Sequence, residues 1–212
     1  MTRRPAPAPA RPDYWLRAKR ELARGDDVLG RIIRAHPRIA LARRGEAFTT
    51  LARAIVGQQI STKAAQSVWD RLLAASPAMD PAAVARLRLP KLRACGLSGR
   101  KAEYIRDLAK HFADGRIDAV RWDPMPDEEI IAELVAVRGV GRWTAEMFLM
   151  FNLLRPDVLP VDDLGLRKAV GLHYGIEPVP AAVRALAERW RPWRSVATWY
   201  LWRSLDPLPV AY

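Results

Sequence analysis

Apolar side chains recur at helical spacing along nearly the whole chain, and this pattern constrains the fold more than any other feature. Aliphatic residues fall at i, i+1, i+4 and i+5 in three separate stretches, within residues 28–33, 51–56 and 130–135. Runs that alternate apolar and polar residues, which would indicate strands, are almost absent. The pattern therefore predicts an all-α fold of about ten short helices, with no strands to build a dinucleotide-binding sheet.

Helix start and stop signals agree with this prediction. Ser61 is expected to cap a helix over residues 62–75, and Asp80-Pro81 reads as an N-cap followed by the first helical residue. Gly96 and Gly115 are expected to end helices, because glycine adopts the left-handed conformation that closes a helix. Many short loops between amphipathic helices are typical of a helical bundle.

The chain is strongly basic, with 35 Lys and Arg against 23 Asp and Glu among 212 residues and a formal net charge of +12. Such a charge favours a polyanionic partner, nucleic acid first and an acidic membrane surface second. Basic residues concentrate in 1–24 and 86–106, whereas 117–133 is acidic. Only residues 14–24 resemble a basic amphipathic helix, and no second anchor accompanies them, so we expect no membrane partner.

Cys95 is the only cysteine in the sequence. One cysteine excludes an internal disulfide, a four-cysteine iron–sulfur cluster and a multi-cysteine zinc site. Residues 1–12 contain prolines and arginines without the apolar core of a secretory signal, so a flexible basic arm over residues 1–11 is the better interpretation. A cytoplasmic location fits both observations.

The segment Leu134 to Ala145 is the most informative one. An apolar helix is expected to end at Val137, the chain turns through Gly139-Val140-Gly141, and a second helix begins near Arg142. Glycines without side chains let main-chain N–H groups at a helix start approach a phosphate oxygen, which binds DNA without reading its sequence. The segment matches neither a dinucleotide fingerprint nor a phosphate-loop motif. Alone, such a turn is also a common structural connection.

Five motifs in order extend this interpretation. The hairpin motif and four others resemble those of the helix-hairpin-helix DNA glycosylases, and within them the 3-methyladenine DNA glycosylase II branch. The resemblance as a whole reaches from about residue 48 to residue 204. The matching stretches are IVGQQISTKAA (55–65), GLSGRKAEY (96–104), VRGVGRWTAEMF (137–148), VLPVDDLGLRK (158–168) and RWRPWRS (189–195).

The resemblance implies two helical subdomains around a cleft. One subdomain would span 41–157 and contain the helix-hairpin-helix motif (134–151), and the other would combine 12–40 with 158–212. The resemblance also implies that the hairpin binds a DNA phosphate. Its expected contacts are Gly139, Val140, Gly141 and Thr144, and the carbonyls of Val137 and Val140 are candidates for a monovalent cation.

Asp162 and Asp163 follow the hairpin by about twenty residues. Standing alone, two carboxylates before a helix indicate an N-cap and a first-turn acid. The resemblance instead assigns catalysis to Asp163 and leaves Asp162 to cap or orient. A carboxylate beside the sugar would stabilise the oxocarbenium-like charge that develops as the N-glycosidic bond breaks. We expect no cofactor and no catalytic metal.

The resemblance places Trp143, Trp202 and Met147 around a flipped base and Gln59 at the wedge that fills the gap left in the duplex. An aromatic face attracts a cationic methylated purine. Trp190 and Trp193 are expected to pack the C-terminal helices instead. Relatives that also cleave the DNA strand carry a lysine where this chain has Trp143, so we expect a monofunctional enzyme that leaves an abasic site.

The sequence thus predicts a monomeric DNA glycosylase that hydrolyses alkylated bases of the 3-methyladenine type from double-stranded DNA in base excision repair. The preferred lesion is left open among 3-methyladenine, 7-methylguanine, hypoxanthine and related bases. The alternative is a non-catalytic helix-hairpin-helix module that binds DNA, in which Asp163 merely caps a helix.

Overall fold

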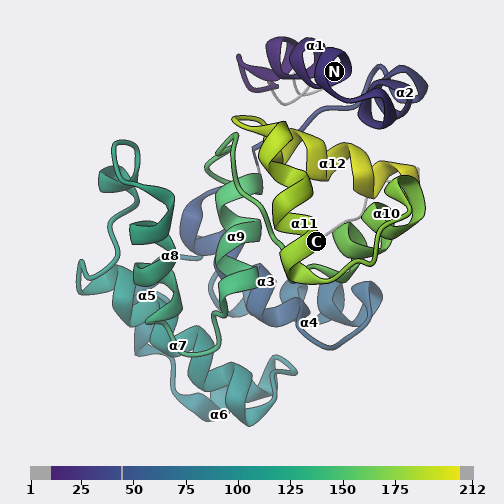
Figure 1. Cartoon of the computed structure of the whole chain (residues 1–212). Helices are drawn as coiled ribbons and strands as arrows, with labels where there is room; N and C mark the ends of the chain where they lie inside the picture. The colour runs from purple at the N-terminus through teal and green to yellow at the C-terminus, as the bar shows by residue number, and fades with distance from the viewer. Residues whose placement is uncertain (1–10, 44, 206–212) are drawn as a thin grey trace, which may run out of the picture. The chain divides into compact units, whose positions relative to one another are not determined.

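The computed structural model describes residues 11–43 and 45–205, and no strand occurs among them (Figure 1). The expected all-α fold is confirmed. These residues form twelve α-helices and two 3₁₀-helices, more than the ten or so expected, because several connections contain helices of only three to six residues. Of the basic arm expected over residues 1–11, only Arg11 falls within the described residues.

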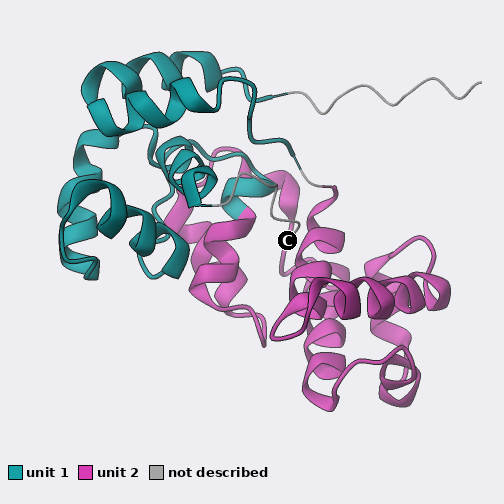
Figure 2. Cartoon of the chain, turned by 90° about the vertical axis from the view of Figure 1, so that its right-hand side faces the viewer, with its two compact units in different colours: residues 1–44, 149–209 teal, residues 45–148, 210–212 magenta. Residues whose placement is uncertain are grey.

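The chain divides into two compact units, coloured separately in Figure 2. The described residues of unit 1 are 11–43 and 149–205, and unit 2 comprises residues 45–148. The second boundary, after residue 148, falls within a helix. We had expected the middle subdomain to span residues 41–157. Each unit has its own buried apolar core.

Unit 1 combines helices from the two ends of the chain. Its first two helices pack against the last one, and the Trp15 ring stacks on Tyr200 with centroids 5.9 Å apart. The buried face of the first helix consists of Trp15, Ala18 and Leu22, so the apolar side of segment 14–24 lies inside the unit. The helices are α1 (Trp15–Gly25), α2 (Asp27–Ala35), α10 (Leu164–Tyr174), α11 (Pro180–Ala187), η2 (Glu188–Trp190) and α12 (Arg194–Leu205).

A buried carboxylate joins the two parts of unit 1. Asp26 caps α2 by accepting the Leu29 N–H at 3.0 Å, and its other oxygen accepts the Tyr174 hydroxyl at 2.9 Å and the Trp190 indole N–H at 3.1 Å. Burial raises the pKa of Tyr174, which keeps its hydroxyl a donor. The N-terminal helices are therefore fixed to the C-terminal third of the chain.

Unit 2 is built around its longest helix, α7, which contacts three other helices of the unit. Aromatic rings link Phe48, Phe112, Trp122 and Phe148 edge to face across the core. The helices are α3 (Ala47–Gly57), α4 (Thr62–Ala75), α5 (Pro81–Arg86), α6 (Leu89–Ala94), α7 (Gly99–Ala113), η1 (Ala119–Trp122), α8 (Asp127–Val135) and α9 (Arg142–Phe151), whose last three residues belong to unit 1.

The expected helix boundaries are confirmed except at one end. Ser61 and Asp80 cap α4 and α5 with their side chains, and Gly96 and Gly115 adopt positive φ just after α6 and α7. The helix expected to end at Val137 ends at Val135. The chain there tightens into i to i+3 hydrogen bonds, with the Val137 N–H donating to Leu134 at 3.1 Å. Among the described residues, no helix has the length and apolar character needed to cross a membrane.

Candidate active site

The glycine turn between α8 and α9 is held from both sides. Gly139 has φ of +85°, and a Cβ at this position would collide with the Tyr104 ring of α7, so the turn requires glycine for its conformation and for its packing. Arg142, the first residue of α9, makes a two-pronged ion pair with Glu128 at 2.6 and 2.9 Å. The two helices of the motif are thus joined at their N-terminal ends.

The turn presents main-chain donors as a phosphate site requires. Within the described residues, the N–H groups of Gly139 and Gly141 donate to no protein acceptor, whereas the Val140 N–H bonds the Val137 carbonyl at 3.1 Å. Helix α9 begins at Arg142, so the N–H of Thr144 in its first turn has no intrahelical acceptor. Fewer main-chain N–H groups are therefore available to a phosphate than expected, because the Val140 N–H bonds within the turn and the Val140 side chain is buried.

A cavity of about 460 Å³ lies beside the turn. It is lined by the turn itself, by the end of α3 and by the first residues of α7, all within unit 2. Two of its lining side chains, Arg100 and Lys101, are cationic. The full lining is Gln58, Gln59, Ser98, Arg100, Lys101, Tyr104, Gly139, Val140 and Gly141.

A second cavity of about 610 Å³ brings together three of the residues expected at the base pocket and the wedge. Trp143 and Met147 reach it from α9, and Gln59 reaches it from the turn between α3 and α4. Trp143 is 39% exposed, whereas Met147 is buried. The volume lies within the range typical of small-molecule pockets. The other lining residues are Arg53, Ala54, Gly57, Gln58, Ile60, Thr62, Thr144, Ala65 and Gln66.

Ile60 also lines the second cavity, although the sequence did not point to it. Its side chain is 41% exposed. Gln59 beside it is one of three described non-glycine residues with positive φ, at +56°. An apolar residue directly before the helix cap Ser61 was the available signal. Such a residue normally packs on the first turns of the helix, and Ile60 remains half open.

Asp163 is placed at the start of α10 in unit 1. Its side chain caps the helix by accepting the Leu166 N–H at 2.7 Å, and the same oxygen accepts the Trp202 indole N–H at 2.7 Å. Asp163 is 8% exposed, whereas Asp162 is exposed. The assignment of capping to Asp162 was therefore wrong. The chain enters the helix one residue later, so Asp163 is both the N-cap and the carboxylate that meets Trp202.

The contact between Asp163 and Trp202 depends on a glycine. A Cβ at Gly165 would lie 3.1 Å from the Asp163 carboxylate oxygen and 3.1 Å from the Trp202 ring. The Trp202 ring also stacks on Phe151, with centroids 6.1 Å apart. A fixed indole therefore holds the orientation of the carboxylate.

Two other tryptophans and one histidine make contacts within unit 1. Trp190 and Trp193 are buried and donate to Asp26 and Glu21, which confirms that they pack unit 1. His173 meets the Ser204 hydroxyl at 2.7 Å, and burial lowers the pKa of its imidazole.

Candidate metal ligands are few. Within residues 11–43 and 45–205, no group of three or more His, Cys, Asp or Glu side chains could hold a metal ion. The monovalent cation expected at the carbonyls of Val137 and Val140 stays a prediction. The Val137 carbonyl accepts the Val140 N–H, and its second lone pair is available to a cation.

Comparisons with known proteins agree with this geometry. The model of the "HhH-GPD superfamily base excision DNA repair protein" family matches residues 52–195. DNA-3-methyladenine glycosylase 1 of Schizosaccharomyces pombe is 33% identical over 165 residues, covering 75% of this chain and 72% of the relative. DNA-3-methyladenine glycosylase 2 of Escherichia coli is 31% identical over 187 residues, covering 82% of this chain. The chain spans 64% of the length of that relative.

A solved structure of the Schizosaccharomyces pombe 3-methyladenine DNA glycosylase in complex with abasic DNA superimposes with a TM-score of 0.76 at 30% identity. The superposition covers 89% of this chain and 96% of that one. The residues matched by the family model include the glycine turn and Asp163. The chain therefore belongs to the HhH-GPD superfamily of base excision DNA repair proteins.

Proposed function

We propose that this chain is a monofunctional DNA glycosylase that hydrolyses the N-glycosidic bond of alkylated bases in double-stranded DNA and leaves an abasic site. The observation that carries the proposal is the buried carboxylate of Asp163, held by the Leu166 N–H and the Trp202 indole at 2.7 Å each. Relatives named as 3-methyladenine DNA glycosylases, one of them bound to abasic DNA, support the same reaction.

Asp163 would act on the sugar. As the bond between C1′ and the base nitrogen breaks, positive charge develops on the sugar, and a carboxylate about 4 Å away at an effective dielectric of about 20 stabilises it by on the order of 4 kcal/mol. That energy corresponds to roughly 10³ in rate. The departing base takes the electron pair of the broken bond, and water then bonds to C1′ and gives a proton to the Asp163 carboxylate or to solvent. A base methylated at N3 or N7 is already cationic and needs no strong acid to leave.

The second cavity would receive the flipped base. Trp143 offers an exposed aromatic face on its wall, and such a face attracts a cationic base by about 0.5–2 kcal/mol. Met147 adds a polarisable apolar wall. Trp202, the third residue expected around the base, bonds the Asp163 carboxylate within unit 1. Trp143 also stands where strand-cleaving relatives carry a lysine, so no amine at that position can form a Schiff base with the sugar.

The turn between α3 and α4, residues 58–61, would supply the wedge. A duplex from which a nucleotide is rotated needs a side chain in the gap, and inserted wedges in DNA-binding proteins are commonly apolar. The expected wedge residue was Gln59. Gln59 and Ile60 are both exposed, and the apolar side chain of Ile60 makes it the stronger candidate for insertion, with Gln59 beside it able to bond the orphaned base.

Base release from chemically methylated DNA tests the proposal. The purified chain is incubated with the DNA, and the freed bases are identified by mass spectrometry. We expect 3-methyladenine, 7-methylguanine or both to be released, with strands that break only after alkaline treatment. Strand breakage without alkali would contradict the monofunctional assignment, and binding without release would favour the non-catalytic module.

A further inference from the structure

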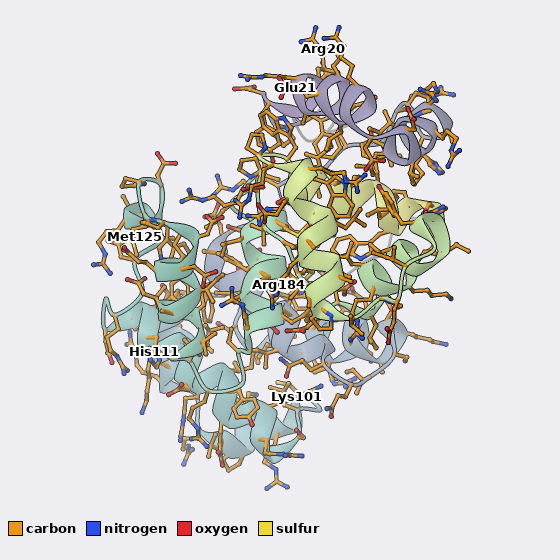
Figure 3. All side chains as sticks on the ribbon, viewed as in Figure 1. Arg20, Glu21, Lys101, His111, Met125 and Arg184 are labelled. Atoms are coloured by element: carbon orange, nitrogen blue, oxygen red, sulfur yellow. The ribbon has the colours of Figure 1, made fainter. Side chains whose placement is uncertain are left out.

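Lys101 occupies an unusual position for a lysine. Its amine donates to the carbonyls of Val56 at 2.8 Å and Gln58 at 2.5 Å, where α3 ends and the α3–α4 turn begins. The last carbonyls of a helix lack intrahelical partners and carry the negative end of its dipole, so an ammonium group placed there is favourable. Lys101, labelled in Figure 3, thus caps the end of a helix remote from its own in sequence.

The turn that Lys101 caps is strained. Gln59 adopts φ of +56°, a left-handed conformation that costs a residue with a side chain on the order of 1–2 kcal/mol. Such a conformation persists only where the surroundings fix it on both sides. Lys101 binds the carbonyl that immediately precedes Gln59. On the other side, Ser61 starts α4 and caps it.

The same turn is tied to the phosphate-binding turn. The Gln58 amide donates to the Gly139 carbonyl at 2.9 Å, and the Tyr104 ring packs on Gly139. Lys101 and Tyr104 are three residues apart on α7 and share one face of that helix. One helix therefore supports both turns, and Gln58 connects the turns directly.

A simple surface role does not account for this geometry. The amine of Lys101 is partly withdrawn from water, and this burial lowers its pKa. Holding a lysine side chain in one arrangement also costs conformational entropy. Two of its three N–H groups donate to main-chain carbonyls. Among the described residues no carboxylate forms an ion pair with it, so its favourable contacts are made to the turn.

We propose that Lys101 is a positioning residue that holds the α3–α4 turn in its left-handed form and, through Gln58, in register with the phosphate-binding turn. This inference rests on the proposed function. Binding of the DNA backbone at Gly139–Gly141 and insertion of Ile60 then occur in one fixed geometry. Lys101 acts through the wedge and not on the sugar or the base.

The test compares Lys101→Met, which keeps an unbranched side chain one atom shorter and removes the donors, with Lys101→Arg, which keeps the charge and donors. Lys110→Met, an exposed lysine on the same helix, is the matched control. Single-turnover release of 7-methylguanine is measured in duplexes that place the lesion opposite cytosine or opposite a mismatched thymine. Flipping costs least at weakened pairs, so a wedge matters most at the paired lesion.

We expect Lys101→Met to slow release about tenfold opposite cytosine, a loss of the size of one charge-assisted hydrogen bond, and clearly less at the mismatch. Lys101→Arg should restore most of the rate, and Lys110→Met should match the unmodified chain. Gln58→Met, which removes the hydrogen bond to Gly139, should likewise slow base release more at the paired lesion than at the mismatch. Equal losses at both pairs would overturn the proposal.

Two further readouts separate this inference from the proposed function. Fluorescence of 2-aminopurine beside a tetrahydrofuran abasic analogue reports unstacking without catalysis, and it should rise less with saturating Lys101→Met than with the unmodified chain. Unchanged fluorescence would contradict a positioning role even if bases are released. The salt dependence of DNA binding is also compared between Lys101→Met and the unmodified chain. A slope reduced by about one phosphate contact in Lys101→Met would assign the amine to the DNA backbone and overturn the proposal as well.

Discussion

At the scale of single residues, one oxygen atom of Asp163 accepts two hydrogen bonds. The main-chain bond fixes the start of α10, and the indole bond fixes the carboxylate against Trp202. Both partners are donors, so the two hydrogen bonds hold the carboxylate in place. Capping and catalysis are therefore compatible roles for one residue.

Trp202→Phe keeps an aromatic ring and removes the indole donor. Hydrogen bonds to charged groups contribute about 1.5–3 kcal/mol, so we expect base release to slow by roughly 10- to 100-fold with little change in DNA affinity. Trp199→Phe on the same helix is the control, because the Trp199 indole N–H is buried and has no hydrogen-bond partner among the described residues. Equal rates for the two variants would contradict the role given to the indole bond.

Gly165→Ala should separate stability from activity. Alanine favours a helix over glycine by up to about 1 kcal/mol, yet its Cβ would press on the Asp163 oxygen and on the Trp202 ring. We expect slower base release with a melting temperature that changes little. Gly171→Ala in the same helix is the comparison, because its Cβ would meet only ordinary contacts from 3.5 Å outward. Full activity of Gly165→Ala would show that the space beside Trp202 is not needed.

At the scale of elements, the helix-hairpin-helix motif is closed by the ion pair of Arg142 with Glu128. Hydrogen bonding to Arg142 lowers the pKa of Glu128 from its ordinary value of 4.5. A carboxyl group with a lowered pKa in the folded state contributes stability above its unfolded pKa, and that contribution is lost as pH falls through the folded pKa. The pair is solvent-exposed, so its contribution is small.

Glu128→Gln should lower the melting temperature by no more than a few degrees near pH 7, because exposed ion pairs contribute roughly 0.2–1 kcal/mol. The difference from the unmodified chain should vanish in acid, below the lowered pKa of Glu128. Glu129→Gln in the same helical turn is the control, since no ion pair is formed by Glu129 among the described residues. A difference that persists at low pH would contradict the electrostatic origin.

The elements also show what the sequence can predict. Ser61, Asp80 and the glycines at 96 and 115 act within a few residues of themselves, so their helix boundaries were predictable. Contacts between segments distant in sequence were not predictable. Nothing local to GLSGRKAEY indicates that Lys101 reaches back to α3, or that Gln58 bonds the glycine turn. Which of Asp162 and Asp163 caps α10 was decided only by the residue at which the helix starts, and that residue makes Asp163 the N-cap.

At the scale of the whole molecule, the net charge of +12 acts through many weak contacts. Each phosphate neutralised by the chain should contribute about −0.9 to the slope of log affinity against log salt concentration. We expect a slope equivalent to several phosphate contacts for a lesion-free duplex, measured by fluorescence anisotropy. Arg100→Gln, at the cavity beside the glycine turn, should reduce the slope by about one contact. A slope near zero would contradict electrostatic binding of the DNA backbone.

The central claim is that the carboxylate of Asp163 drives hydrolysis, and Asp163→Asn tests it most directly. Asparagine keeps the oxygen that caps α10 and removes the charge, so the fold and DNA affinity should be retained. Release of methylated bases from DNA, followed under single-turnover conditions with Asp162→Asn as the control, should fall by about 10³ in Asp163→Asn and stay near normal in the control. Unchanged release by Asp163→Asn would contradict the account.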